Sequence, residues 1–262
     1  MKSDSGQALV ETAIVMPLFV FLLLGTIQLG LLHQAHLMTH YAAYKAVRAG
    51  SLNHADRDVM RRAAAAALLP MISWQDNGRE NVMPVTDAVS YVTKVQLVRA
   101  MALAVAPVDV TICGPTRNNV RSTTGIDPVA RRAAQEIQFD APLNIAQADW
   151  RASDRTKLRI EVTFNYRMPI PFANMILYKI ARGQEDAELL WLTRLGKQDF
   201  TARRREARFL HDAMAAAGLG YTLPLRASYA MRMMSDLYPA RSGFALPTSN
   251  ECHIPFPKRG GE

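Results

Sequence analysis

Three histidines in the first part of the chain have a spacing that metal ligands can use. His33, His36 and His40 recur at i, i+3 and i+7, so a helix would carry all three on one face. A complete site needs a further ligand, and no Cys, Asp or Glu occurs between the first and the last of the three. We interpret them as polar residues beyond an apolar helix, and the sequence predicts neither a metal site nor a cofactor.

The chain lacks the sequence patterns of the common catalytic sites. It contains no H-E-x-x-H, no G-x-S-x-G, no glycine-rich phosphate loop and no C-x-x-C. No spacing pairs a nucleophile with a base. We therefore expect no catalytic residue and no small-molecule substrate, and a membrane-tethered enzyme is the least favoured interpretation of the chain.

Basic residues gather in two clusters, within a net charge of +8. The clusters lie at residues 117–121 and 203–205, and such clusters are typical of proteins that bind nucleic acid or anionic lipid. The second cluster, however, stands in a helical pattern with Asp199 and Glu206, as on a solvent-exposed face. We therefore do not expect a nucleic-acid partner.

Cys113 and Cys252 are the only cysteines of the chain. An even number of cysteines in an exported protein suggests a disulfide. This bond would join the end of a predicted strand to the tail from Arg241 to Glu262, which is rich in Pro and Gly. Two unpaired thiols are the alternative.

The apolar residues concentrate in one uncharged run near the start of the chain. The run from Thr12 to Leu32 has about 21 residues and would span roughly 30 Å as a helix, the thickness of a bilayer core. It is too long for a removable secretory signal, and no small-x-small cleavage site follows it. Helix-forming residues continue to Gly50, which is expected to cap the helix. The sequence predicts a retained anchor within one helix of about 40 residues.

Two residues distinguish this run from a plain anchor. Glu11 is an ionisable group at its edge, where burial is expensive, so it is a candidate functional residue. Pro17 lies inside the run and removes a backbone donor, which predicts either a kink or a proline that the membrane helix tolerates. Gly6 stands five residues before Glu11, in the sequence G-Q-A-L-V-E.

This segment resembles the processing site of type IV prepilins. The sequence G-Q-A-L-V-E-T-A-I-V-M-P-L is similar to the N-terminal sequence of TadE-like pseudopilins of tight-adherence (Tad/Flp) pilus systems. Two later stretches agree with this resemblance, A-A-Y-K-A-V-R-A-G ending at Gly50 and L-P-L-R-A-S at residues 223–228. The middle of the chain shows no such likeness.

The resemblance implies how the N-terminus is processed and used. A prepilin peptidase would cut between Gly6 and Gln7, and the new amine of Gln7 would then be methylated. Glu11 would pair with the N-terminal amine of a neighbouring pilin or pseudopilin of the Tad system. Such a pair sets the register of assembly more than it adds net stability. The implied function is that of a minor pseudopilin-like component of pilus assembly.

Charges beside the apolar run give conflicting signals about topology. Lys2 precedes the run, Lys45 and Arg48 follow it, and an excess of basic residues normally marks the cytoplasmic side. Long domains, however, are translocated largely regardless of charge. We therefore follow the prepilin-like leader and expect a single pass through the inner membrane. The N-terminus would be cytoplasmic and the C-terminal domain periplasmic or in the pilus.

The expected organisation is a leader at residues 1–6, a transmembrane and assembly helix at 7–50, and an exported domain at 51–262. The domain is predicted to be α+β, an antiparallel sheet covered by helices. Its predicted strands cover residues 108–113, 158–170 and 223–234, and its predicted helices cover residues 56–69, 84–104, 127–134, 172–181 and 185–217.

A binding module is the alternative function. In that case the uncut anchor tethers a basic exported domain that recognises anionic polymers or DNA. This interpretation predicts that Glu11 is dispensable and that the basic clusters matter.

Overall fold

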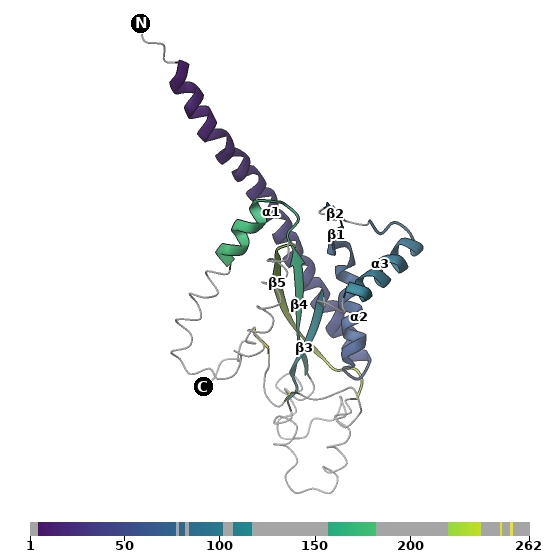
Figure 1. Cartoon of the computed structure of the whole chain (residues 1–262). Helices are drawn as coiled ribbons and strands as arrows, with labels where there is room; N and C mark the ends of the chain where they lie inside the picture. The colour runs from purple at the N-terminus through teal and green to yellow at the C-terminus, as the bar shows by residue number, and fades with distance from the viewer. Residues whose placement is uncertain are drawn as a thin grey trace, which may run out of the picture. The chain divides into compact units, whose positions relative to one another are not determined.

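The computed structural model describes residues 5–76, 79–81, 84–101, 107–116, 157–181, 220–236, 247 and 252–253 (Figure 1). These residues belong to two compact units. The first comprises Met1–Ala35, Ser73–Val82 and Arg167–Leu223, and the second comprises His36–Ile72, Met83–Tyr166 and Pro224–Glu262. The elements are α1 (Ser5–Leu52), α2 (Arg57–Leu68), η1 (Leu69–Met71), β1 (Trp74–Asp76), β2 (Arg79–Asn81), α3 (Ala88–Met101), β3 (Val108–Gly114), β4 (Lys157–Arg167) and β5 (Thr222–Arg232). A further helix covers residues 173–181.

The long N-terminal helix is confirmed, but the sequence-based prediction of its end was wrong. Gly50 lies inside α1, which continues to Leu52. The turn after the helix uses left-handed conformations at His54 and Ala55, with φ of 54° and 56°. The carbonyl of Gly50 accepts hydrogen bonds from the N–H groups of Asn53 (3.2 Å) and Ala55 (2.9 Å). Gly50 therefore does not cap the helix, and its lack of a side chain serves another purpose.

The sheet confirms the α+β class. Its strands run antiparallel in the order β3-β4-β5, with Val110 opposite Val162 and Ile112 opposite Ile160. Alternate residues of β4 are buried on one face because side chains of a strand point to opposite faces in turn. These residues are Leu158, Ile160, Val162, Phe164 and Tyr166.

The strand ends differ slightly from the predicted ones, for reasons of proline chemistry. β4 stops at Arg167 rather than at Ile170 because Pro169 has no N–H with which to continue the ladder. β5 contains Pro224, which is tolerated because this strand lies at the edge of the sheet.

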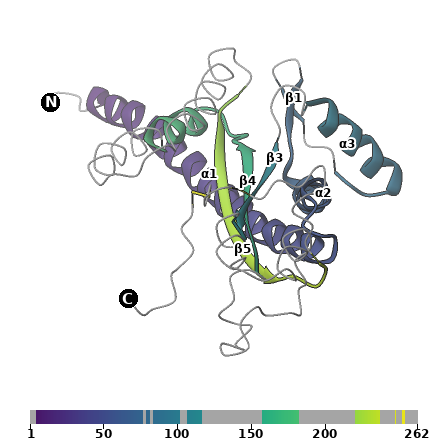
Figure 2. The ribbon, with the colours of Figure 1, turned by 90° about the horizontal axis from the view of Figure 1, so that it is seen from below.

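The end of α1 packs on this sheet together with α2. Tyr44 of α1 meets Tyr229 of β5 edge to face, with ring centroids 5.5 Å apart. The N–H of Met234 donates to the carbonyl of Ser51 at 3.0 Å. A Cβ on Gly50 would lie 2.9 Å from Cδ2 of Leu158 and would also overlap Met60 of α2. The glycine therefore permits the close approach of α1, α2 and β4, and Figure 2 shows α2 between β3 and the end of α1.

α2 begins and ends as its sequence predicts. The Asp56 carboxylate caps it by accepting from the N–H groups of Asp58 (2.8 Å) and Val59 (3.3 Å). Pro70 stands in the 3-10 turn that follows the helix. The Arg57 side chain donates to the carbonyl of Val110 at 2.8 Å, which ties α2 to β3.

Of the other predicted helices and strands, some are confirmed, and others lie outside the described residues. α3 occupies Ala88–Met101, inside the predicted span, and the short helix before residue 182 is confirmed. The paired strands β1 and β2 were not predicted. The predicted helices at 127–134 and 185–217 and most of the tail lie outside the described residues.

We predict that Gly50→Val lowers the free energy of unfolding by about 1–3 kcal/mol, because the added methyl groups overpack the contact with Leu158 and Met60. Thermal unfolding in detergent, followed by circular dichroism, measures the change. Gly30→Val is the matched control, since a Cβ there meets nothing within 4 Å in the described chain. Equal melting temperatures for the two variants would contradict the assigned role of Gly50.

Candidate functional site

The first half of α1 is an apolar surface without cover from the described parts of the chain. Every residue from Leu9 to Leu23 is exposed, including large side chains such as Phe19 at 53% and Leu18 at 65%. Only 6% of the most apolar window of α1 is buried. Of the residues that the structure describes, only those of α1 form a helix long and apolar enough to cross a membrane. A helix that is apolar on every face needs lipid or other apolar helices around it.

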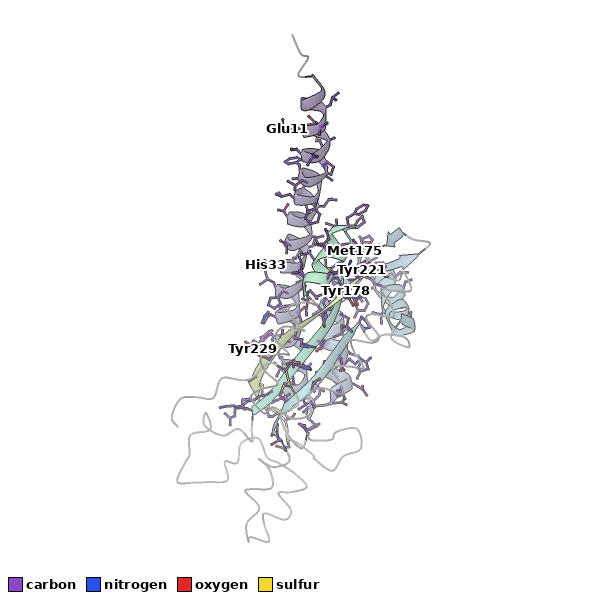
Figure 3. All side chains as sticks on the ribbon, turned by 60° about the vertical axis from the view of Figure 1, so that its left-hand side comes forward. Glu11, His33, Met175, Tyr178, Tyr221 and Tyr229 are labelled. Atoms are coloured by element: carbon purple, nitrogen blue, oxygen red, sulfur yellow. A yellow bond between two sulfur atoms is a disulfide. The ribbon has the colours of Figure 1, made fainter. Side chains whose placement is uncertain are left out.

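Glu11 lies on this apolar surface, close to the start of α1 (Figure 3). Its side chain is exposed, and no cation among the described residues pairs with it. Gly6 and Gln7 lie in the first turn of the same helix. Glu11 is four positions after Gln7 in the sequence, which is about 6 Å along the helix axis. An amine at Gln7 and the carboxylate of Glu11 would therefore stand about one turn apart.

Pro17 lies within α1, and the helix continues on both sides of it. The proline cannot donate to the carbonyl four residues earlier, that of Ala13. A helix surrounded by lipid must satisfy such a carbonyl from a neighbouring group. The predicted role of Pro17 in assembly stays a prediction.

The histidines with ligand-like spacing include one contacting pair. The Nε2 atoms of His36 and His40 are 3.2 Å apart, and their rings pack edge to face. His33 is exposed (Figure 3). Within the described ranges, no group of three His, Cys, Asp or Glu side chains could hold a metal ion.

Sequence reasoning missed Gln28, the buried polar residue of the apolar run. Its side chain is fully buried, whereas its neighbours Ile27 and Leu29 are 55% and 51% exposed. Its Oε1 accepts a hydrogen bond of 3.1 Å from the N–H of Ile170, at the turn before the helix of residues 173–181. A lone amide within an apolar run was the available signal. It identifies the face of α1 that contacts the rest of its own chain.

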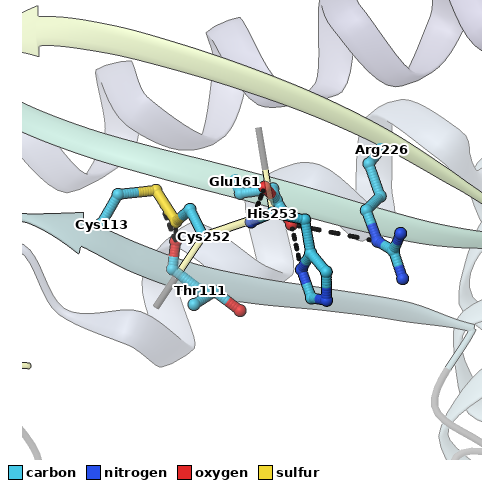
Figure 4. Close-up of a disulfide and its surroundings, with 6 residues drawn as sticks. All are labelled: Thr111, Cys113, Glu161, Arg226, Cys252 and His253. Atoms are coloured by element: carbon cyan, nitrogen blue, oxygen red, sulfur yellow. Dashed lines mark hydrogen bonds and ion pairs between the residues drawn. A yellow bond between two sulfur atoms is a disulfide. The ribbon is translucent and has the colours of Figure 1, made fainter. Parts of the chain in front are cut away.

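The two cysteines are joined in the structure, with Cα atoms 5.4 Å apart (Figure 4). The bond attaches the tail to the face of the sheet opposite α1. There the N–H of His253 donates to Oε2 of Glu161 at 2.8 Å, and its Nδ1 lies 3.0 Å from Oε1. Arg226 approaches the same carboxylate, with Nε 4.0 Å from Oε1. Sequence reasoning missed Glu161, which is only 1% exposed and therefore depends on these partners.

Lys94 is a second ionisable residue with a buried side chain. Its side chain is fully buried on α3, and this burial lowers the pKa of the amine below its usual range. The two arginine clusters, at 117–121 and 203–205, lie outside the described residues.

Comparison with known proteins gives a match over the N-terminal helix. Residues 6–48 match the family model described as TadE-like protein. The match begins at Gly6 and ends four residues before the end of α1, so it covers the apolar surface and Glu11 but none of the sheet. The resemblance seen in the sequence is confirmed over these residues. Comparison with the curated proteins and with the solved structures finds no match.

We predict that protein purified without reductant contains the Cys113–Cys252 bond, which closes a loop with a sequence separation of 139 residues. It should migrate faster on a non-reducing gel than on a reducing one, and Cys252→Ser should abolish the difference. Loss of the bond should lower the free energy of unfolding by about 2–5 kcal/mol. His253→Ala is the matched control, because it removes a contact with Glu161 and leaves both sulfur atoms. Equal mobility of the wild-type protein under both conditions would refute the bond.

Proposed function

We propose that this protein is a minor pseudopilin-like component of a Tad-type pilus assembly system. One observation carries the proposal: the residues that match the TadE-like family form a helix whose apolar first half is exposed on all sides. A helix of this kind is suited to two environments in turn, a lipid bilayer before assembly and a bundle of similar helices after it.

In the bilayer, the run from Thr12 to Leu32 spans the hydrocarbon core of the inner membrane. The short leader remains in the cytoplasm, and the chain after Leu52 lies in the periplasm or in the pilus. The exposure of Leu9 to Leu23 supports this arrangement, because lipid would remove that surface from water. The absence of charged residues between Thr12 and Leu32 supports it as well.

At the cytoplasmic face, a prepilin peptidase removes residues 1–6 by cutting between Gly6 and Gln7. The product carries a positive amine at Gln7 and a negative carboxylate at Glu11, about one turn apart on one apolar helix. Each charge needs an opposite charge when the helix leaves water. A neighbouring pilin or pseudopilin with the same arrangement supplies it, if the two helices are in the correct register.

The role is structural rather than catalytic. The exported sheet and its helices serve to present a surface at the end of α1, and α1 makes the assembly contacts. The alternative, a tethered module that binds anionic polymers, would depend on the arginine clusters. No observation on the described residues favours it.

The first test of this function is the N-terminus itself. We predict that protein purified from cells with an active prepilin peptidase begins at Gln7, so its intact mass lacks residues 1–6. Gly6→Val should block the cut, because a β-branched side chain would occupy the position at which the peptidase must approach the backbone. Gly25→Val, a change of the same size in the same helix, should be cut normally. A mature chain that begins at Met1 would contradict the proposal.

The second test concerns Glu11. We predict that Glu11→Gln is inserted and cut normally but no longer co-purifies with pilus subunits from solubilised membranes. Removal of one partner of a buried ion pair costs about 3–5 kcal/mol, which corresponds to a loss in affinity of at least about 100-fold. Asp58→Asn is the matched control, since it removes an exposed carboxylate on α2. Equal recovery of subunits with both variants would favour the tethered binding module.

A further inference from the structure

The helix of residues 173–181 exposes apolar side chains where a water-facing helix would expose polar ones. Phe172, at its start, is 71% exposed, and Met175 and Ile180 are 37% and 53% exposed. At 100° per residue, Met175 and Ile180 lie on the same half of the helix as the exposed Lys179. The exposed face is therefore mainly apolar, with a single charged side chain.

Phe172 adopts a backbone conformation that is unfavourable for a phenylalanine. Its φ is 63°, in the left-handed region that bulky side chains rarely occupy. Hydrogen bonds fix the turn around it, from the N–H of Asn174 to the carbonyl of Ile170 (3.1 Å) and from that of Ala173 to the carbonyl of Pro171 (2.8 Å). This strained backbone directs the aromatic ring of Phe172 outward, and exposure of the ring to water does not compensate for the strain. Burial of the ring in apolar surroundings would offset the cost of the strain.

The contact with Gln28 sets the depth of this turn along α1. Gln28, which binds the N–H of Ile170, lies four residues before Leu32, the end of the apolar run. The turn therefore lies about 6 Å inside that end, measured along the helix axis. Figures 1 and 2 both show the helix of residues 173–181 beside α1. Interfacial helices bury their apolar face about 5–10 Å into the boundary between headgroups and acyl chains.

The remaining residues at this level suit a membrane–water boundary. The rings of Tyr178 and Tyr221 pack with centroids 5.2 Å apart, beside α1 (Figure 3). Tyrosines are enriched at such boundaries because the ring is apolar and the hydroxyl group is polar. Lys179 is exposed and long enough to extend its amine toward the headgroups while its stem stays in apolar surroundings.

We propose that Phe172, Met175 and Ile180 insert into the periplasmic leaflet of the bilayer that α1 crosses. The inference rests on the proposed membrane insertion of α1. Phospholipid acyl chains near the headgroups are the partner, because Ile27 and Leu29, which flank Gln28 on α1, are also exposed apolar side chains at the same depth. This second attachment fixes the rotation and depth of α1 and thereby the orientation in which Glu11 meets a neighbouring subunit.

Site-directed spin labelling of the full chain in nanodiscs of phosphatidylethanolamine and phosphatidylglycerol tests the proposal. The label is placed at Met175→Cys in non-reduced protein, and wild-type protein treated in the same way gives the background. Leu18→Cys reports on the membrane span, and Arg62→Cys reports on an exposed residue of α2. We expect the labels at positions 175 and 18 to collide with oxygen and to be shielded from a water-soluble nickel chelate, and the label at position 62 to do the reverse.

Each other outcome overturns a specific statement. If position 175 contacts the chelate while position 18 lies in lipid, the second attachment is wrong and the membrane span stands. If both positions contact the chelate, the proposed insertion of α1 is wrong as well. If position 175 is shielded from both reagents while position 18 lies in lipid, a protein surface covers the helix and the lipid contact is refuted.

A second variant separates lipid contact from folding. Phe172→Asn relieves the left-handed strain, because asparagine tolerates this conformation, but it removes the inserted ring. We expect the melting temperature in detergent to be unchanged or raised, and the label at position 175 to shift toward the chelate accessibility of position 62. Leu52→Asn, which changes an exposed leucine at the end of α1, should leave the label unaffected. No shift with Phe172→Asn would overturn the proposal.

Discussion

The first half of α1 exposes apolar side chains on all faces, and no described part of the chain covers them. Water alone is an unfavourable surrounding for such a surface, because burial of apolar area is the main driving force for folding and association. The surface must therefore lie in lipid or among other helices. Residues 6–48, which include this surface, match the TadE-like family model. In the proposed function Glu11 selects the partner, because its carboxylate needs an opposite charge when the surface around it is buried.

The second half of the same helix follows a different rule. Small side chains replace large ones, and Gly50 lets the helix backbone come close to Leu158 and Met60. On the other face of the sheet, the tail is fixed by the Cys113–Cys252 bond beside the buried Glu161. In the proposed function, the first half of the helix exchanges lipid for other helices, whereas the second half keeps its packing against the sheet. This division suits a subunit that must move between a membrane and an assembly without unfolding.

Local patterns explain which features could be predicted from the sequence. Three features depend only on residues that are close together in the sequence, and all three are present in the structure. They are the apolar run, the cap of α2 at Asp56 and the alternation in β4. Contacts between distant residues could not be predicted in this way. The bond between Gln28 and Ile170 spans 142 positions, and the choice of His253 as partner of Glu161 depends on where the tail lies. The strands β1 and β2 have three residues each, too few for a periodic pattern to show.

In the proposed assembly, Glu11 pairs with the processed N-terminus of a neighbouring subunit. Zero-length carbodiimide coupling in membranes from pilus-producing cells tests it most directly, because it joins a carboxylate to an amine only where the two are in contact. We predict that mass spectrometry finds a cross-linked peptide in which Glu11 is joined to the N-terminal amine of a second pilus subunit. If Glu11 instead couples only to a small soluble amine added to the same membranes, the carboxylate faces water, and this result contradicts the pairing of Glu11 with a neighbouring N-terminus.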